Sequence, residues 1–205
     1  MLRLWDIPIL KMSNAPLIAL ILAGGESKRM GKSKAWLEYH GEPQVIWLYQ
    51  QLKSIVGSAL ISINQWPENQ IPLPCITDLP SYQNHGPISG ILSAFELHHA
   101  PMLVMGCDYP LLNRQHLTAL IEQRELSADA TVCSNSEGYF EPLFGIYEVS
   151  GLIKLKQHFE SGNNSISAFL RKSIVHPLKD IPEMVMRSVD TEEGYKAVVK
   201  MMAKG

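Results

Sequence analysis

The sequence predicts an α/β fold, a three-layer sandwich in which helices cover both faces of a mostly parallel, doubly wound sheet. Over the first 125 residues, apolar segments of strand length alternate with segments of helical periodicity. This order produces right-handed crossovers between parallel strands. The segment 17–22 is continuously apolar, as expected of a central strand that is covered on both faces.

Proline and glycine mark where the first helices begin. Pro43 opens a stretch with apolar residues at helical spacing as far as Ile55, and Gly86-Pro87 opens a second stretch that reaches Leu97. Later helices are expected over residues 114–124, over residues 152–159 and from residue 192 onward. The remaining strands are expected over residues 58–63, 73–77, 102–105, 130–133, 140–147 and 174–178.

Length and composition fit one globular domain. A single hydrophobic core can extend over 205 residues, of which 46% are hydrophobic and 19% charged. We expect one domain over residues 16–205, preceded by an N-terminal extension over residues 1–15. Arg3 and Lys11 precede the first apolar segment in the manner of a signal peptide, but Asp6 and the shortness of that segment favour a core strand.

Charge and cysteine content argue against several classes of partner. The formal net charge of -2, without a run of lysine and arginine, gives no basic field for nucleic acid. No stretch approaches the ~18 to 20 apolar residues of a membrane span. Three cysteines without a C-x-x-C pair argue against a disulfide framework and indicate a reducing, cytoplasmic location. The seven histidines lack metal-ligand spacing, so surface positions are expected for them.

The loop from Leu22 to Lys34 carries the most informative pattern in the chain. Gly24 and Gly25 follow the buried strand directly, and several lysines and arginines come after them. Backbone amides that glycines leave exposed, together with cations, form a nest for anions, and a triphosphate matches such donors. The alternative is a glycine turn with solvated basic residues. A glycine pair on its own would indicate this alternative. The whole string favours a nucleoside triphosphate.

Two other nucleotide-binding loops do not fit the spacing. Gly31-Lys32-Ser33 supplies the end of a Walker A motif, but five residues instead of four separate Gly25 from Gly31. A dinucleotide fingerprint would need G-x-G-x-x-G after the strand, which the sequence lacks. A P-loop hydrolase is therefore disfavoured.

Asp108 is the candidate metal ligand. It follows the buried strand 102–105, and Tyr109-Pro110 turns the chain behind it. A carboxylate at the carboxyl end of a strand is well placed for a hard cation such as Mg²⁺ that keeps several waters. The alternative is an Asx-type turn or a helix cap. With the loop nearby, we favour the metal.

The string from Leu22 to Lys34 resembles the L-A-G-G-x-S-x-R-M-G-x-x-K signature of the nucleotidyltransferases similar to molybdenum cofactor guanylyltransferase, the MobA-like proteins. The matching residues are Leu22, Ala23, Gly24, Gly25, Ser27, Arg29, Met30, Gly31 and Lys34. Further matches follow in order at Gly41-Glu-Pro43, Asn64, Asp78, Gly86-Pro87-Ile-Ser-Gly90, Cys107-Asp-Tyr-Pro110 and Glu141-Pro-Leu-Phe144. The resemblance covers about residues 17–147 well.

This resemblance implies a Rossmann-like fold and transfer of GMP from GTP to a molybdopterin-type cofactor, with Mg²⁺ and release of pyrophosphate. It implies nucleotide contacts from the loop and from two later positions, and Asp108 as the metal ligand. Lys34 and Arg29 would offset charge on the leaving pyrophosphate. The residues that it places on the nucleotide are Leu22, Ala23, Gly24, Gly25, Lys34, Asn64, Asp78 and Asp108. Other molybdenum cofactor proteins are possible partners, and we expect a monomer or a weak homo-oligomer.

The chain departs from the family pattern near its C-terminus. The tail is Asp190-Thr-Glu-Glu where the family has N-T-P-x-D, and Ser33 replaces an aspartate that many members carry. The acceptor and the preference for guanine therefore stay open. The alternatives are cytidylyl transfer to the same cofactor, nucleotidyl transfer to another small phosphate, and a nucleotide-binding protein without turnover.

Overall fold

The computed structural model of the protein describes residues 16–24, 34–64, 72–189 and 191–203. These residues build a seven-stranded sheet with the order β3-β2-β1-β4-β6-β5-β7. Only β6 runs antiparallel to its neighbours in this sheet, which confirms the mostly parallel arrangement. The strands are β1 (Ile18–Leu22), β2 (Ala59–Ile63), β3 (Cys75–Thr77), β4 (Met102–Gly106), β5 (Ala130–Ser134), β6 (Phe140–Tyr147) and β7 (Val175–Leu178).

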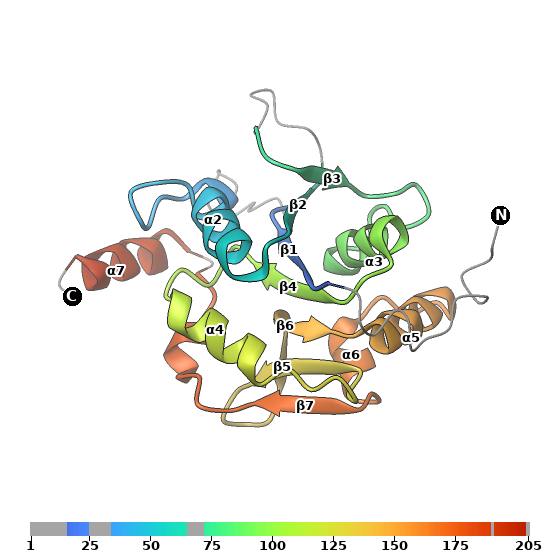
Figure 1. Ribbon diagram of the computed structural model, residues 1–205. Coiled ribbons are helices and arrows are strands. Elements are labelled where there is room, and N and C mark those ends of the chain that lie inside the picture. The colour runs from blue at the N-terminus through green and yellow to red at the C-terminus, as the bar shows by residue number, and fades with distance from the viewer. Residues whose placement is uncertain (1–15, 25–33, 65–71, 190, 204–205) are drawn as a thin grey trace.

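Helices cover both faces of this sheet (Figure 1). Helices α3, α5 and α6 share one hydrophobic core with one face, and α2 and α4 share a second core with the other face. The three-layer sandwich is therefore confirmed. The helices are α2 (Gln44–Val56), α3 (Pro87–His98), α4 (Arg114–Glu122), α5 (Val149–Glu160), α6 (Ile166–Leu170) and α7 (Glu192–Met202), with short 3-10 turns η2 (Lys34–Trp36) and η3 (Glu183–Met186).

Strand β1 lies in the interior of the sheet, between β2 and β4. Ala19 and Ile21 point into the core beneath α2, whereas Ile18 and Leu20 point into the core beneath α3. Because both faces are covered, every residue of the strand can be apolar, which is why the sequence of β1 shows no alternation.

The order of the strands reverses beside β1. The chain leaves β1 for β2 on one side, and β4 later pairs with the other side of β1, with Leu22 opposite Gly106. Connections that depart in opposite directions leave a crevice at the carboxyl ends of the two strands. The loops that follow Leu22 and Gly106 border that crevice.

Some expected boundaries were wrong, and some short elements were not expected. Helix α5 begins at Val149 instead of residue 152, directly after the end of β6. Helix α6 spans one turn and is stabilised by the Ser165 hydroxyl, which accepts a hydrogen bond from the amide of Ala168 at 3.1 Å. A helix this short leaves no periodic pattern. Residues 1–15, the expected N-terminal extension, lie outside the described residues, and no described helix is long and apolar enough to cross a membrane.

A buried ion pair fixes the end of α4 against the start of α5. Arg124 donates two hydrogen bonds to the carboxylate of Glu148, at 2.6 and 2.8 Å. Glu148 is 3% exposed, so its charge depends on this partner. Removing one member of such a pair leaves an uncompensated charge inside the protein.

We predict that Arg124→Ala lowers the free energy of unfolding by about 3 kcal/mol, because Glu148 then stays buried without its cation. Urea denaturation measures the change. Lys196→Ala is the control, since Lys196 forms an exposed pair with Glu192 on α7 and its loss should leave the midpoint unchanged. Equal midpoints for the two variants would contradict the prediction.

Candidate active site

A cavity of about 200 Å³ lies at the carboxyl edge of four neighbouring parallel strands. The ends of β1, β2 and β4 and the residue after β3 all contribute to its wall, as does Leu143 of the antiparallel strand β6. The lining residues are Leu22, Ala23, Gly24, Lys34, Ala35, Ser62, Asn64, Asp78, Gly86, Pro87, Gly90, Gly106, Cys107, Asp108 and Leu143. The sheet thus gathers residues that are far apart in the chain.

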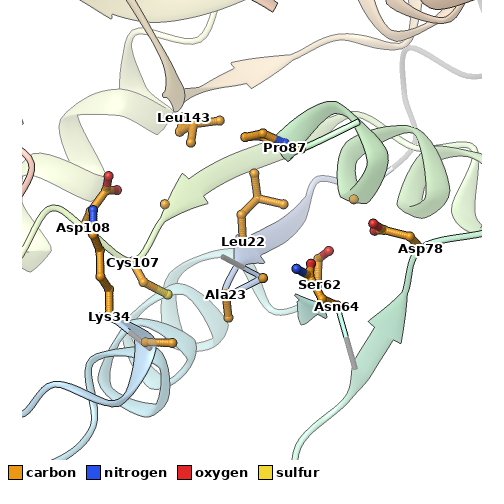
Figure 2. Close-up of a pocket in the computed structure, with 15 residues that line it drawn as sticks. Leu22, Ala23, Lys34, Ser62, Asn64, Asp78, Pro87, Cys107, Asp108 and Leu143 are labelled. Carbon is orange, nitrogen blue, oxygen red and sulfur yellow. The ribbon is translucent and has the colours of Figure 1, made fainter. Parts of the chain in front are cut away.

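The cavity has two chemically different ends (Figure 2). Lys34 and Asp108 lie at one end, and Asn64 and Asp78 lie at the other, with the end of β1 between them. One end carries charges suited to phosphate and a cation, and the other carries polar groups suited to a base or a ribose.

Seven of the nine residues that the sequence predicted for the site line this cavity. They are Leu22, Ala23, Gly24, Lys34, Asn64, Asp78 and Asp108. The other two, Gly25 and Arg29, lie outside the described residues. The structure therefore brings the described candidates together, and their binding roles stay predictions.

Gly24 has to lack a side chain because Asn64 lies against it. A Cβ at residue 24 would overlap the amide oxygen of Asn64 and lie 3.1 Å from the Asn64 backbone nitrogen. Ala23 donates a backbone hydrogen bond to Ser62 at 2.9 Å, which holds the end of β1 beside the end of β2. This close approach places the backbone of the loop and the amide of Asn64 side by side on the cavity wall.

Helix α3 points its N-terminus at the cavity. Gly86 and Pro87 open the helix and line the cavity, and no side chain caps the first turn. Gly90 allows the helix to approach the sheet, since a Cβ there would overlap the hydroxyl of Ser62 and lie 3.0 Å from Leu22. The positive end of the helix dipole makes this a favourable place for a negatively charged ligand.

Two buried serines of α3 fix the loop that carries Asp78. The Ser93 hydroxyl accepts a hydrogen bond from the amide of Leu79 at 2.8 Å, and the Ser89 hydroxyl accepts one from the amide of His85 at 3.1 Å. Both serines are fully buried. Burial raises the pKa of the Asp78 carboxyl above its usual value. Sequence patterns did not single out either serine, because their partners depend on how the loop folds over the helix.

Asp108 is positioned by its own loop and by the C-terminal segment. Gly106 makes room for it, since a Cβ at residue 106 would lie 2.5 Å from its Oδ1. Val189 donates a backbone hydrogen bond to the Asp108 carbonyl at 3.1 Å. After burial, the Asp108 charge is the next largest cause that raises the pKa of Tyr109.

The donors in the cavity fit a hard divalent cation. The Asp108 carboxylate presents oxygen, and its Oδ1 is shielded from solvent. Among the described residues no group of three or more histidine, cysteine or acidic side chains converges as a metal site. A site with one protein carboxylate, completed by substrate phosphates and water, is the kind that Mg²⁺ uses.

A second cavity, of about 510 Å³, shares Asp108 and Leu143 with the first. Tyr109 donates a hydrogen bond to Glu141 at 3.3 Å on its wall. Burial raises the pKa of Glu141, and the charge of Asp108 raises it further. The lining residues are Asp108, Tyr109, Asn135, Glu141, Pro142, Leu143, Glu183, Met186, Arg187 and Ser188. No sequence pattern pointed to Arg187, because it lies in the tail that matches the family loosely.

His40 is partly buried, whereas a surface position was expected for the histidines. Its ring stacks on Trp47 with the centroids 3.8 Å apart, and its Nε2 is buried. Burial lowers the pKa of His40, although the nearby Pro110 backbone opposes this shift. His40 thereby connects the segment after Lys34 to the loop after Asp108.

Comparisons with known proteins agree with this geometry. A model of the MobA-like NTP transferase domain matches residues 19–178. The molybdenum cofactor guanylyltransferase of Ectopseudomonas mendocina is 31% identical over 154 residues, which cover 73% of this chain and 75% of that protein. The protein of the same name from Pseudomonas fluorescens is 28% identical over 166 residues, covering 78% of this chain and 82% of its own length.

Solved structures share the fold at lower sequence identity. Molybdopterin-guanine dinucleotide biosynthesis protein A from Archaeoglobus fulgidus has a TM-score of 0.76 and 20% identity, and the match covers 92% of this chain and 100% of that one. A CMP:2-keto-3-deoxy-manno-octonic acid synthetase complexed with CTP has a TM-score of 0.69 and 12% identity, with coverage of 93% and 99%.

We predict that Gly24→Ala weakens GTP binding about tenfold or more, because overpacking against Asn64 costs on the order of 1 to 3 kcal/mol. Isothermal calorimetry measures the dissociation constant. The matched control is the same change in an Asn64→Ala background, where the overlap with the amide no longer exists. An equal loss of affinity in both backgrounds would show that the contact with Asn64 is not the cause.

Proposed function

Because this chain belongs to the family of MobA-like NTP transferases, we propose that it transfers GMP from GTP to the phosphate of molybdopterin and releases pyrophosphate. The observation that carries this proposal is the cavity in which Lys34 and Asp108 face Asn64 and Asp78 across the end of β1. A nucleoside triphosphate can place its phosphates at the first pair and its base and ribose at the second.

The donor nucleotide is held by backbone and side chains together. The ends of β1 and α3 supply amides, and Lys34 supplies a positive charge for the phosphates. Asn64 offers both a donor and acceptors to the base and ribose region, and Asp78 offers acceptors when it is ionised. Gly25 and Arg29 extend this nest in our proposal, as the signature string indicates.

Asp108 would hold the Mg²⁺ ion that the family resemblance implies. The bound cation supplies positive charge that offsets the negative charge of both phosphate substrates. The reaction needs in-line placement rather than a protein nucleophile, since the acceptor phosphate is itself the nucleophile. An oxygen of the acceptor phosphate forms a bond to the α-phosphorus of GTP, while the bond from the α-phosphorus to the oxygen that bridges to the β-phosphorus breaks. Lys34 stabilises the negative charge of the pyrophosphate that leaves.

The second cavity is our candidate for the acceptor site. It meets the first cavity at Asp108 and Leu143, so an acceptor there can direct its phosphate at the donor. Arg187 offers a planar cation for phosphate recognition. Asn135 offers its side-chain NH₂ group as a donor, since its Oδ1 already accepts hydrogen bonds from the amides of Glu137 and Tyr139. This cavity is built mainly by the second half of the chain, whereas the first cavity is built mainly by the first half.

Cytidylyl transfer is the second candidate. The fold is shared with a synthetase that was solved with CTP, so the arrangement of strands does not by itself select guanine. Only the groups at the base end of the cavity, Asn64 and Asp78 among them, can distinguish the two nucleotides.

We infer a reducing compartment, the cytoplasm, because Cys75, Cys107 and Cys133 are free thiols. A monomer or weak homo-oligomer stays our expectation. Other molybdenum cofactor proteins stay possible partners.

The base preference tests the proposal directly. We predict that the purified protein with Mg²⁺ binds GTP more tightly than CTP, ATP or UTP in calorimetric titrations, and releases pyrophosphate from GTP only when molybdopterin is present. Binding of CTP or UTP without binding of GTP would exclude guanylyl transfer. Tight GTP binding without pyrophosphate release in the presence of molybdopterin would identify a nucleotide-binding protein without turnover.

A second prediction concerns Asp108. Asp108→Asn keeps the size of the side chain but removes the charge that would hold the cation, so Mg²⁺-dependent pyrophosphate release should fall about 100-fold or more. GTP binding without a divalent cation should be retained. Glu122→Gln, at an exposed position of α4, is the control and should behave as wild type. Full turnover by Asp108→Asn would remove Asp108 from the mechanism.

A further inference from the structure

The C-terminal helix α7 packs beside the active site and away from the main cores. None of its residues is buried. It contacts the rest of the chain through a small group that we name the C-terminal cluster. The members of this cluster are Leu37, Tyr39, Val189, Tyr195, Val198, Val199 and Met202.

Tyr195 makes the specific contacts of α7 within this cluster. Its ring meets the ring of Tyr39 edge to face, with centroids 5.1 Å apart and an angle of 67°. Its hydroxyl donates a hydrogen bond to the Glu38 carbonyl at 3.0 Å. Aromatic pairs in this geometry stabilise a contact beyond the area they bury. One side chain of α7 thus holds two consecutive residues of the segment after Lys34.

That segment is short and hydrogen-bonded to Lys34. The Leu37 amide donates to the Lys34 carbonyl at 3.2 Å, and the Gln44 amide donates to the Leu37 carbonyl at 2.9 Å. A displacement of residues 38 and 39 is therefore transmitted to the backbone of Lys34 through this hydrogen-bonded turn. The ammonium group of Lys34 would move with it.

The same C-terminal segment also holds the other charged group of the site. Val189, a member of the C-terminal cluster, donates its hydrogen bond to the Asp108 carbonyl. Burial raises the pKa of Tyr39, and the nearby Tyr195 and Asp108 raise it further. The backbones of Lys34 and Asp108 are therefore connected through one cluster that Tyr195 completes.

The start of α7 is fixed by a side-chain cap and by close packing. The Thr191 hydroxyl caps α7 by accepting a hydrogen bond from the amide of Gly194 at 3.1 Å. Gly194 lies close to Val189, since a Cβ at residue 194 would lie 3.5 Å from Val189 Cγ1. The cap and this close packing fix where the helix begins, and so place Tyr195 against Tyr39.

We propose that Tyr195 is a positioning residue that sets the spacing between Lys34 and Asp108 and thereby the rate of nucleotidyl transfer. This inference rests on the proposed function. Small displacements of groups that orient reacting phosphates reduce the rate much more than they reduce the affinity. The role of Tyr195 is therefore visible in kcat rather than in the KM for GTP.

The test uses the full chain with Tyr195→Phe and Tyr195→Leu. We expect kcat to fall about threefold for Tyr195→Phe, which keeps the ring, and about 30-fold for Tyr195→Leu, which loses the ring contact and the hydrogen bond. The KM for GTP should change less than twofold. Lys196→Ala, the next residue on the exposed face of α7, should match wild type in both parameters.

A double-mutant cycle with Tyr39→Leu separates positioning from stability. The fall in kcat for Tyr39→Leu and Tyr195→Leu should be strongly non-additive, because each change breaks the same contact. Thermal unfolding and assays well below the melting temperature verify that the compared proteins are folded. If Tyr195→Leu does not fold, the fall in kcat of Tyr195→Phe, which loses only the hydrogen bond to Glu38, decides the matter.

Wild-type kcat in the folded Tyr195 variants, or a fall in kcat that only follows the unfolded fraction, overturns the proposal. A wild-type protein without turnover would refute the proposed function separately. In that case, Mn²⁺ binding in the presence of GTP decides the positioning role, since a displaced Asp108 weakens binding of the cation. Unchanged Mn²⁺ affinity in Tyr195→Leu would then overturn the proposal.

Discussion

The pairing of β1 with β4 is the constraint on which the rest of the site depends. Because Leu22 lies opposite Gly106, the two loops that follow these residues begin at the same level of the sheet and border one crevice. A shift of one residue in this register would turn the side chains of β4 to the opposite face. The two hydrophobic cores, which take alternate residues of β1 and β4, hold the register in place.

Close packing of backbone against polar side chains is the second feature of the site. Gly24, Gly90 and Gly106 each occupy a point where a methyl group would overlap a polar side chain. The partners of these glycines are Asn64, Ser62 and Asp108, all of which line the cavity. The absence of three Cβ atoms therefore allows polar groups to stand directly against the strand ends, where backbone amides are also available to a nucleotide.

The two cavities are built by different parts of the chain. Strands β1 to β4 and helix α3 line the cavity that we assign to the donor, and this half carries the residues that match the family signature. Strand β6 and the turn η3 contribute half of the residues that line the cavity that we assign to the acceptor. Asp108 belongs to both cavities, so its charge acts where the two substrates would meet. The C-terminal segment returns to this point through Val189, which connects the end of the chain to the reaction centre.

The sequence by itself determined the order of the main helices and strands, the interior position of β1, and the family signature of the loop that follows it. These features depend on local periodicity and on a contiguous string, which a sequence displays directly. Only the tertiary structure decided that Asn64 and Asp78 meet Lys34 and Asp108 in one cavity, since the strands that carry them become neighbours through long-range pairing. The same holds for Arg187 in the second cavity and for Tyr195 against Tyr39, because contacts between segments far apart in the chain leave no local pattern; Tyr195 and Glu38, for example, are 157 residues apart.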